Sequence, residues 1–287
     1  MSPRWFNGLV VLFWLSTMSW LVVAKILPSL LTGEPPSYKR IVLAADETPP
    51  SVAWDMFWDE APIGHARSQM IRQPDGMTEI ESHVRIESLP LAELTPPWMS
   101  HVLRLLEGDD IVLDLLAESS FAIDPLGHLA SFRAKLDTPD GLTLMNMQGV
   151  VNEDRLKVTV RADQLVHSTE MFLPADALVG DAFSPREQLP NLHIGQTWTV
   201  PVFSPFQPPT SPMEVLRASV ERQEFLVHGQ TAVQCWLVVY RADNGGTSKA
   251  AQAARGRVWV RTDGMVLKQE MLMFEHRLTF VRAEPDE

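Results

Sequence analysis

Apolar and polar residues alternate along much of the chain. Between residues 77 and 88, Ile80 and Val84 fall on one face of an extended strand, while charged side chains fall on the other. The same alternation recurs in residues 156–161 and, in part, in residues 257–274. Strands with one apolar and one wet face are typical of antiparallel sheets. The pattern therefore predicts half-buried antiparallel strands.

Turn signals separate these strands and indicate the fold class. They combine proline, aspartate and glycine, which supply the preset or positive φ that a tight reversal needs. We expect about ten to twelve strands in a mainly β fold, arranged as a large curved antiparallel meander with one or two short helices. A half-barrel and two packed sheets both satisfy the pattern. The turn signals are Pro74-Asp75-Gly76, Pro125-Leu126-Gly127, Pro139-Asp140-Gly141, His228-Gly229 and Asp263-Gly264.

Three segments break the β pattern. Residues 95–107 begin with Thr-Pro-Pro and carry apolar side chains at helical spacing, which predicts a helix packed on the sheet. Residues 184–187, Ser-Pro-Arg-Glu, resemble a capping box with proline at the first helical position, which predicts a short helical turn. Residues 203–212 hold four prolines and two phenylalanines, so they form either a lid over a cavity or a crossing connection.

An uncharged run of 20 residues extends from Trp5 to Ala24. As a helix it would span about 30 Å, the thickness of a bilayer core. Tryptophan lies near each end, where indole rings favour the lipid headgroups. A cleaved secretory signal is the alternative, although its apolar region would be long and the cleavage-site pattern is poor. We therefore expect residues 1–25 to be an uncleaved transmembrane anchor, or signal-anchor.

The anchor implies a location and a domain organisation. The flanking charges do not fix its orientation, but single N-terminal anchors usually export the domain that comes after them. We expect a single-pass protein of the inner (cytoplasmic) membrane with an extracytoplasmic, periplasmic C-terminal domain. Residues 26–50, with five prolines, are expected to be a Pro-rich linker, and residues 51–287 an extracytoplasmic antiparallel β domain. A boundary near residue 168 would divide that domain into two halves.

Charge and composition limit the kinds of partner that the protein can bind. The 287 residues include 24 basic and 36 acidic side chains, for a formal net charge of -12, and the basic ones do not cluster, which argues against nucleic acid. A lone cysteine, Cys235, excludes an internal disulfide. The eight histidines show no metal-ligand spacing, so we expect no metal site and no cofactor. The partners that remain are the membrane, through the N-terminal helix, and an envelope protein or an apolar ligand.

Catalytic signals are weak. Cys235 lies within the apolar run VQCWLVV, where a buried thiol is inert. Acidic pairs such as Asp109-Asp110 and Asp59-Glu60 could do acid–base chemistry, but solvated turns account for them in a chain this acidic. No GxSxG nucleophile motif and no glycine-rich phosphate loop occurs. We therefore predict that the protein is not an enzyme.

Two stretches resemble known exported domains. FWDEAPIGHARSQM (57–70) and DPLGHLASFRAKL (124–136) are similar to hairpins of the exported N-terminal β domain of bacterial transglutaminase-like proteins. The meander as a whole resembles the half-barrel of periplasmic lipoprotein carriers. These resemblances cover residues 54–165 and imply an exported β domain. No Cys, His and Asp catalytic module comes after it, so they imply no catalytic residue.

These features predict a membrane-tethered extracytoplasmic binding or structural module of a bacterial envelope. Two alternatives stay open: a lipid or lipoprotein acceptor with an apolar cavity, and a hydrolase that uses dispersed carboxylates. For the acceptor, large aromatic and aliphatic side chains of the 95–107 helix and the proline-rich segment would contact the ligand. These candidate ligand-binding residues are Trp98, Met99, Val102, Leu103, Leu106 and Phe206.

Overall fold

The computed structural model describes residues 4–21, 36–45, 49–90, 112–162, 165–203, 211–243, 253–273 and 276–284. This part of the chain contains the helices α1 (Arg4–Leu21) and α3 (Tyr38–Ala44) and one sheet of fifteen strands. The strands are β1 (Val52–Trp58), β2 (Ala61–Arg72), β3 (Thr78–Pro90), β4 (Val112–Ile123), β5 (Leu129–Asp137), β6 (Thr143–Asn152), β7 (Arg155–Ala162), β8 (Leu165–Phe172), β9 (Gly180–Asp181), β10 (Thr197–Phe203), β11 (Met213–His228), β12 (Thr231–Ala242), β13 (Ala254–Arg261), β14 (Val266–Met273) and β15 (His276–Arg282).

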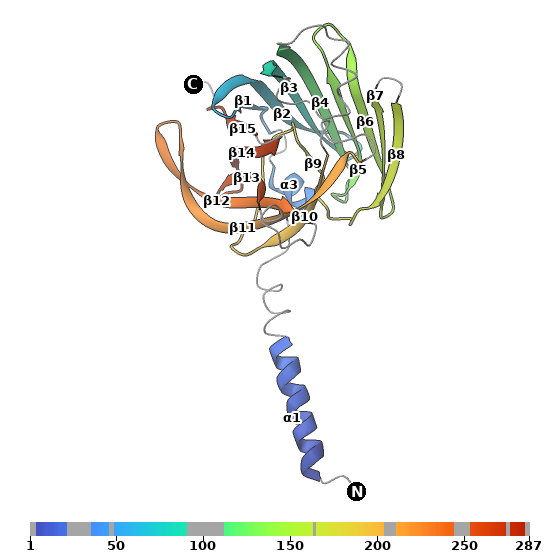
Figure 1. Ribbon diagram of the computed structural model, residues 1–287, viewed down its shortest axis with the longest axis vertical. Helices are drawn as coiled ribbons and strands as arrows, with labels where there is room; N and C mark the ends of the chain where they lie inside the picture. Colours follow the sequence, from blue (N-terminus) through green and yellow to red (C-terminus); the bar gives the residue numbers. More distant parts are fainter. Residues whose placement is uncertain are drawn as a thin grey trace.

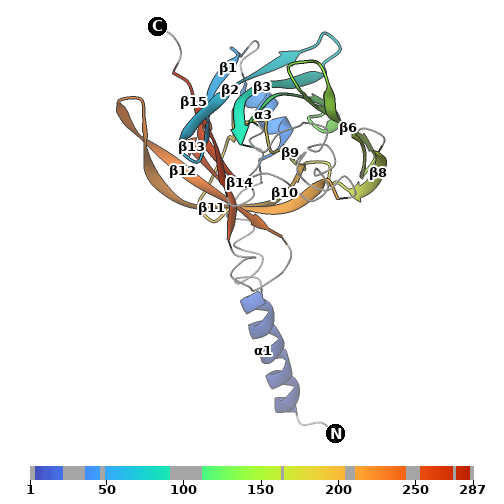
Figure 2. The same cartoon turned by 45° about the horizontal axis from the view of Figure 1, so that its top comes forward.

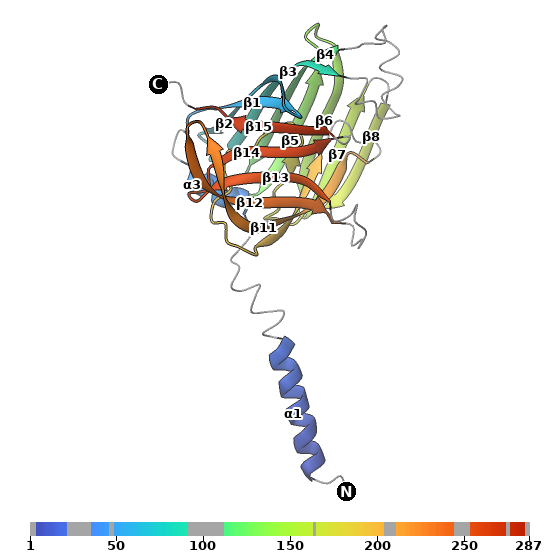
Figure 3. The same cartoon turned by 60° about the vertical axis from the view of Figure 1, so that its left-hand side comes forward.

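The chain passes through the sheet in two runs that meet in the middle. Strands β1 to β8 form one antiparallel meander and β10 to β15 form the other, and β1 pairs antiparallel with β15. Strands β8 and β9 are therefore the two ends of the sheet, and β9 pairs in parallel with β10. Figures 1 and 3 show that the sheet is strongly curved, so its two runs face each other across an interior. The predicted boundary near residue 168 falls within the end strand β8.

Alternating burial follows the alternation of the sequence. In β1, Val52, Trp54, Met56 and Trp58 are buried on the inner face, while the residues between them are less buried. The predicted turns also form: the 74–76 turn has Gly76 at φ 87°, and the amide of Met77 donates to the Asp75 carboxylate. The prediction of a mainly β protein with a large curved antiparallel sheet is thus confirmed, with more strands than expected.

The interior of the curved sheet is filled by the protein's own chain. Helix α3 and the segment 173–196, which connects β8 to β10 and includes β9, lie inside the curve (Figures 1 and 2). Tyr38 and Ile41 of α3 are buried in the same core as the inner faces of the strands, and so are Val179, Phe183 and Leu189 of the segment. We call residues 173–196 the interior segment. Its contacts make it part of the hydrophobic core.

Backbone hydrogen bonds tie the interior segment to the sheet. The amide of Ala182 donates to the carbonyl of Phe203 in β10, and the amide of Leu189 donates to the carbonyl of Gly264. In return, the amide of Val266 in β14 donates to the carbonyl of Glu187. Buried backbone groups need such partners because an unpaired one costs free energy comparable to a lost hydrogen bond. The segment is therefore fixed by the sheet that surrounds it.

A smaller apolar cluster lies on the outer face. Cys235, Leu237 and Val239 of β12 pack there with Trp259 of β13 and Leu267 of β14. Burial raises the pKa of the Cys235 thiol to about 11, so the neutral thiol predominates near pH 7. The prediction that Cys235 is a buried strand residue is confirmed.

The N-terminal part of the chain gives two findings. Within the described residues, none of the helices is long and apolar enough to cross a membrane. The transmembrane anchor over residues 1–25 therefore stays a prediction from the sequence. The region 26–50, predicted as a linker, contains α3, whose buried side chains join the core. The helix predicted over residues 95–107 lies outside the described residues.

Candidate functional site

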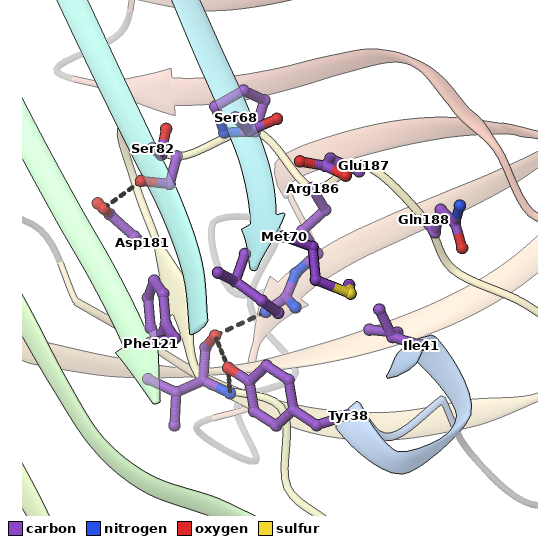
Figure 4. A pocket seen from close by; sticks show the side chains of 14 residues that line it. Tyr38, Ile41, Ser68, Met70, Ser82, Phe121, Asp181, Arg186, Glu187 and Gln188 are labelled. Atoms are coloured by element: carbon purple, nitrogen blue, oxygen red, sulfur yellow. Dashed lines mark hydrogen bonds between the residues drawn. The ribbon is translucent and has the colours of Figure 1, made fainter. Parts of the chain in front are cut away.

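A cavity of about 60 Å³ with mainly apolar walls and a few polar groups lies between the inner face of the sheet, helix α3 and the interior segment (Figure 4). Strands β2, β3 and β4 supply one wall and residues 179–188 supply the other. The walls mix apolar side chains with hydroxyl, carboxylate and guanidinium groups. The lining residues are Tyr38, Ile41, Ser68, Met70, Ile80, Ser82, Phe121, Val179, Asp181, Ser184, Pro185, Arg186, Glu187 and Gln188.

Tyr38 and Arg186 hold the backbone at Val179. The Tyr38 hydroxyl donates to the Val179 carbonyl at 3.0 Å and accepts from the Val179 amide at 3.3 Å. The Arg186 guanidinium donates to the same carbonyl at 2.8 Å (Figure 4). Burial raises the pKa of the Tyr38 phenol, so it stays neutral and keeps its proton to donate. This set of bonds joins α3 to the interior segment.

Asp181, the last residue of β9, is a buried carboxyl group within the interior segment. Its Oδ1 accepts from the amide of Phe183 at 2.9 Å, and its Oδ2 accepts from the Ser184 hydroxyl at 2.6 Å. Burial raises the pKa of this carboxyl, while hydrogen bonds from Ser184, Phe183 and Ser119 and the charge of Arg186 oppose the rise. A carboxyl with a raised pKa takes up a proton more readily in the folded chain.

The helical turn predicted at residues 184–187 is wrong. The Ser184 hydroxyl bonds Asp181 instead of capping a helix, and the amide of Arg186 donates to the Gln269 side chain at 3.3 Å. The carbonyl of Glu187 accepts from Val266 of β14. Contacts with the sheet therefore occupy the groups that a helical turn would use.

Glu187 is the second carboxyl of the cavity. Burial raises its pKa, and the Ser68 hydroxyl and the charge of Arg282 oppose that rise. Ser68 is itself buried and accepts from the Trp54 indole at 3.1 Å. Among the described residues, Glu187 Oε1 and the buried Ser82 hydroxyl have no hydrogen-bond partner. These two groups can bond a small polar guest.

Arg186 also lines a second cavity of about 40 Å³, together with Tyr240 and Gln269. A water molecule needs roughly 10–15 Å³ of such space, whereas pockets for drug-sized ligands measure roughly 300–1,000 Å³. Both cavities therefore fit water or a group of a few atoms. Neither has room for an acyl chain.

The site predicted from sequence lies elsewhere in the chain. Trp98, Met99, Val102, Leu103, Leu106 and Phe206 are all outside the described residues, so their part in ligand binding stays a prediction. Sequence reasoning missed Asp181, Arg186, Glu187 and Tyr38 as parts of an interior polar site. The sequence carries one signal of this site: Asp181 interrupts the apolar run ALVGDAF. A charged side chain in a buried segment needs hydrogen-bond or ionic partners, so its presence there indicates polar neighbours. Within the described chain, no group of three or more His, Cys, Asp or Glu side chains could hold a metal ion.

Comparisons with known proteins find two solved structures that align with much of this chain at low sequence identity. No family model matches the sequence, and no curated protein matches it. A β-barrel-like protein of the domain of unknown function DUF1849 from Brucella abortus aligns with a TM-score of 0.46 and 8% identity, over 82% of this chain and 95% of that one. A DUF1089 family protein from Pseudomonas aeruginosa aligns with a TM-score of 0.34 and 12% identity, over 70% and 87%. Neither protein is described as a transglutaminase-like protein or a lipoprotein carrier.

The raised pKa of Asp181 predicts a pH-dependent stability. A group whose folded pKa lies above its unfolded value, about 3.9 for aspartate, stabilises the fold below that value and loses this contribution as pH rises through the folded pKa. Asp181→Asn removes the titration and keeps the shape of the side chain. Because burial of the ionised carboxylate costs free energy in the wild type, we expect the melting temperature of Asp181→Asn to exceed that of the wild type at pH 7.5. The difference should shrink toward pH 4.

Thermal unfolding followed by circular dichroism between pH 4 and pH 8 measures this effect. Asp176→Asn is the matched control, since Asp176 is an exposed carboxylate of the same interior segment. A melting temperature of Asp181→Asn below that of the wild type at pH 7.5 would show that the ionised carboxylate stabilises the fold.

Proposed function

We propose that this protein is a non-enzymatic binding or structural module that acts through its outer surface. The observation that carries the proposal is the filled interior: α3 and the interior segment occupy the concave side of the sheet. Within the part of the chain that the structure describes, the cavities between them that Arg186 lines measure about 60 and 40 Å³. A protein that carried lipid inside this sheet would need a continuous apolar space several times larger.

The membrane tether and the extracytoplasmic location belong to the same proposal. They rest on the uncharged run from Trp5 to Ala24. A module of this kind would present its sheet to an envelope partner next to the membrane. Asp181 gives the hydrolase alternative little support, because both of its oxygens are engaged in hydrogen bonds that shape its own loop.

Native mass spectrometry of the full chain tests the proposal against the lipid acceptor. The protein is expressed in a bacterial envelope, extracted in a mild detergent and freed of that detergent in the instrument. We expect the mass of the chain alone. A lipid of defined mass retained at one copy per chain, and released only on unfolding, would contradict the proposal and favour the acceptor.

A further inference from the structure

The end strand β8 gives the sheet an open edge. Strand β8 pairs with β7 alone and lies at the rim of the sheet (Figures 1 and 3). The other end strand, β9, has two residues, and both are buried. An edge strand presents a row of unpaired backbone N–H and C=O groups with which another strand can pair. Strand β8 is therefore the place where the sheet can be extended.

Alternate residues of β8 direct their backbone groups to this edge. The register that pairs Arg155 with Phe172 also places Asp154 opposite Leu173, and the amide of Leu173 donates to the carbonyl of Asp154. In an antiparallel pair of strands, opposite residues that bond each other alternate with opposite residues that do not. Odd-numbered residues of β8 therefore bond β7, and even-numbered residues present their N–H and C=O groups to the edge. The even-numbered residues are Val166, Ser168, Glu170 and Phe172.

Strand β8 lacks the features with which proteins usually protect an edge. It has eight residues without proline or lysine, and its register with β7 has no bulge. Its even-numbered side chains are on the exposed face of the sheet, where Val166 and Phe172 are 61% and 65% exposed. A strand with these properties is suited to pairing with another strand.

The sequence of β8 is complementary to itself when a second copy of the strand runs antiparallel to it. With Thr169 opposite Thr169 of the second copy, even-numbered residues lie opposite even-numbered residues, as their edge-facing groups require. Val166 then lies opposite Phe172, and Ser168 lies opposite Glu170. Each of these pairs exchanges two backbone hydrogen bonds. Threonine pairs and pairs of aromatic and β-branched side chains add to the stability of antiparallel strands.

Other registers lose these pairs. A shift by one residue places edge-facing groups opposite residues that already bond β7. A register centred on Glu170 brings two like charges directly opposite each other, which is destabilising. A register centred on Ser168 places Val166 opposite Glu170 and leaves Phe172 without a partner on β8. The register centred on Thr169 therefore satisfies the backbone and the side chains together.

From this geometry we propose that two copies of the protein associate through antiparallel pairing of their β8 strands. The two sheets then form one continuous sheet, related by a two-fold axis at Thr169. The interface is only one strand edge wide, so we expect a reversible dimer with a dissociation constant on the order of 10 μM. This self-association goes beyond the proposed binding role and does not depend on it.

Disulfide trapping of the full chain tests the pairing. In this register the two Thr169 residues form a pair without mutual hydrogen bonds, with Cα atoms about 4.5 Å apart, which a disulfide can span. The two Ser168 residues lie diagonally across the strands, roughly 7–8 Å apart, which exceeds the usual span. We therefore expect oxidation to give a covalent dimer with Thr169→Cys and little with Ser168→Cys.

Exposure alone predicts the opposite order, because Ser168 is exposed and Thr169 is half-buried. The variants are oxidised in a zwitterionic detergent and separated by electrophoresis without reductant. The wild type controls for the buried Cys235 and should stay monomeric on the gel. Crosslinking of Ser168→Cys equal to or greater than that of Thr169→Cys would overturn the proposal.

Sedimentation velocity of the full chain measures the association without a crosslink. In Ser168→Pro, the ring replaces an edge-facing N–H and leaves the bonds to β7 in place. We expect its dissociation constant to exceed that of the wild type at least about tenfold. Ser168→Ala is the matched control, because it loses the same hydroxyl, which lies 3.0 Å from Thr159 Oγ1, and keeps the amide.

The control Ser168→Ala should associate as the wild type does, and circular dichroism shows whether each variant is folded. All variants carry the same N-terminal segment, so a difference between them reports on β8. A wild type that stays monomeric at about 100 μM, well above the expected dissociation constant, would overturn the proposal. Equal association of folded Ser168→Pro and Ser168→Ala would overturn it as well.

Discussion

Replacing Phe203 by alanine is expected to lower the free energy of unfolding by about 3–5 kcal/mol, the cost of truncating a fully buried phenylalanine. Phe203 belongs to β10 and is 1% exposed. Its ring stacks on Phe132 of β5 at 5.1 Å between centroids and lies 6.4 Å from Phe121 of β4. The two runs of the sheet therefore meet through this ring. Losing it removes contacts from both runs at once.

Urea unfolding followed by tryptophan fluorescence and by circular dichroism measures the loss. Phe225→Ala is the matched control, because Phe225 of the adjacent β11 is 73% exposed and its loss should cost less than about 0.5 kcal/mol. We also expect the two probes to give one coincident transition in the wild type. A destabilisation of Phe203→Ala no larger than that of Phe225→Ala would show that the two runs do not share a core.

Gly149→Val is expected to destabilise the protein by about 3 kcal/mol through overpacking. Gly149 of β6 pairs across the sheet with Phe132 of β5. A Cβ at this position would lie 2.1 Å from Cε1 of the Phe132 ring, which real contacts do not permit. The ring cannot move away easily, since Phe121 and Phe203 stack against it. Glycine is thus required here by the close approach of a ring, without any positive φ.

A double variant tests this cause. Phe132→Leu makes room beside Gly149, so Gly149→Ala should cost less in that background than in the wild type. Gln148→Val serves as the control for the strand, because Gln148 is the exposed neighbour of Gly149. If Gly149→Ala lowers the free energy of unfolding by the same amount in the wild type and in Phe132→Leu, the Phe132 ring does not exclude a side chain at position 149.

The sequence predicts the strands well, because a strand buried on one face has apolar and polar residues at alternating positions. Ile80 and Val84 alternate with charged residues, and Cys235 lies in an apolar run, so both assignments come from local pattern. The strand number was underestimated, since the end strand β8 exposes apolar Val166 and Phe172 and half-buries polar Thr169. End strands of this kind carry a weak signal.

The interior could not be predicted in the same way. Tyr38 and Val179 are separated by 141 positions, and their contact depends on the curvature of the whole sheet. Ser184-Pro185-Arg186-Glu187 has the local pattern of a helix start, but its donors and acceptors bond β14 and Asp181. Each of these features depends on contacts between residues far apart in the sequence, and a local sequence pattern does not show such contacts.

Native-state hydrogen exchange tests the filled interior most directly. The amides of Ala182 and Leu189 bond the sheet from the interior segment, and the amide of Val266 bonds the segment from the sheet. If the segment is a permanent part of the core, these amides exchange only through global unfolding, with the same protection as the inner strands β1 and β5. If Ala182 and Leu189 exchange through a local opening while β1 and β5 stay protected, the segment is a displaceable lid and the interior is open to a ligand, which contradicts a permanently filled core.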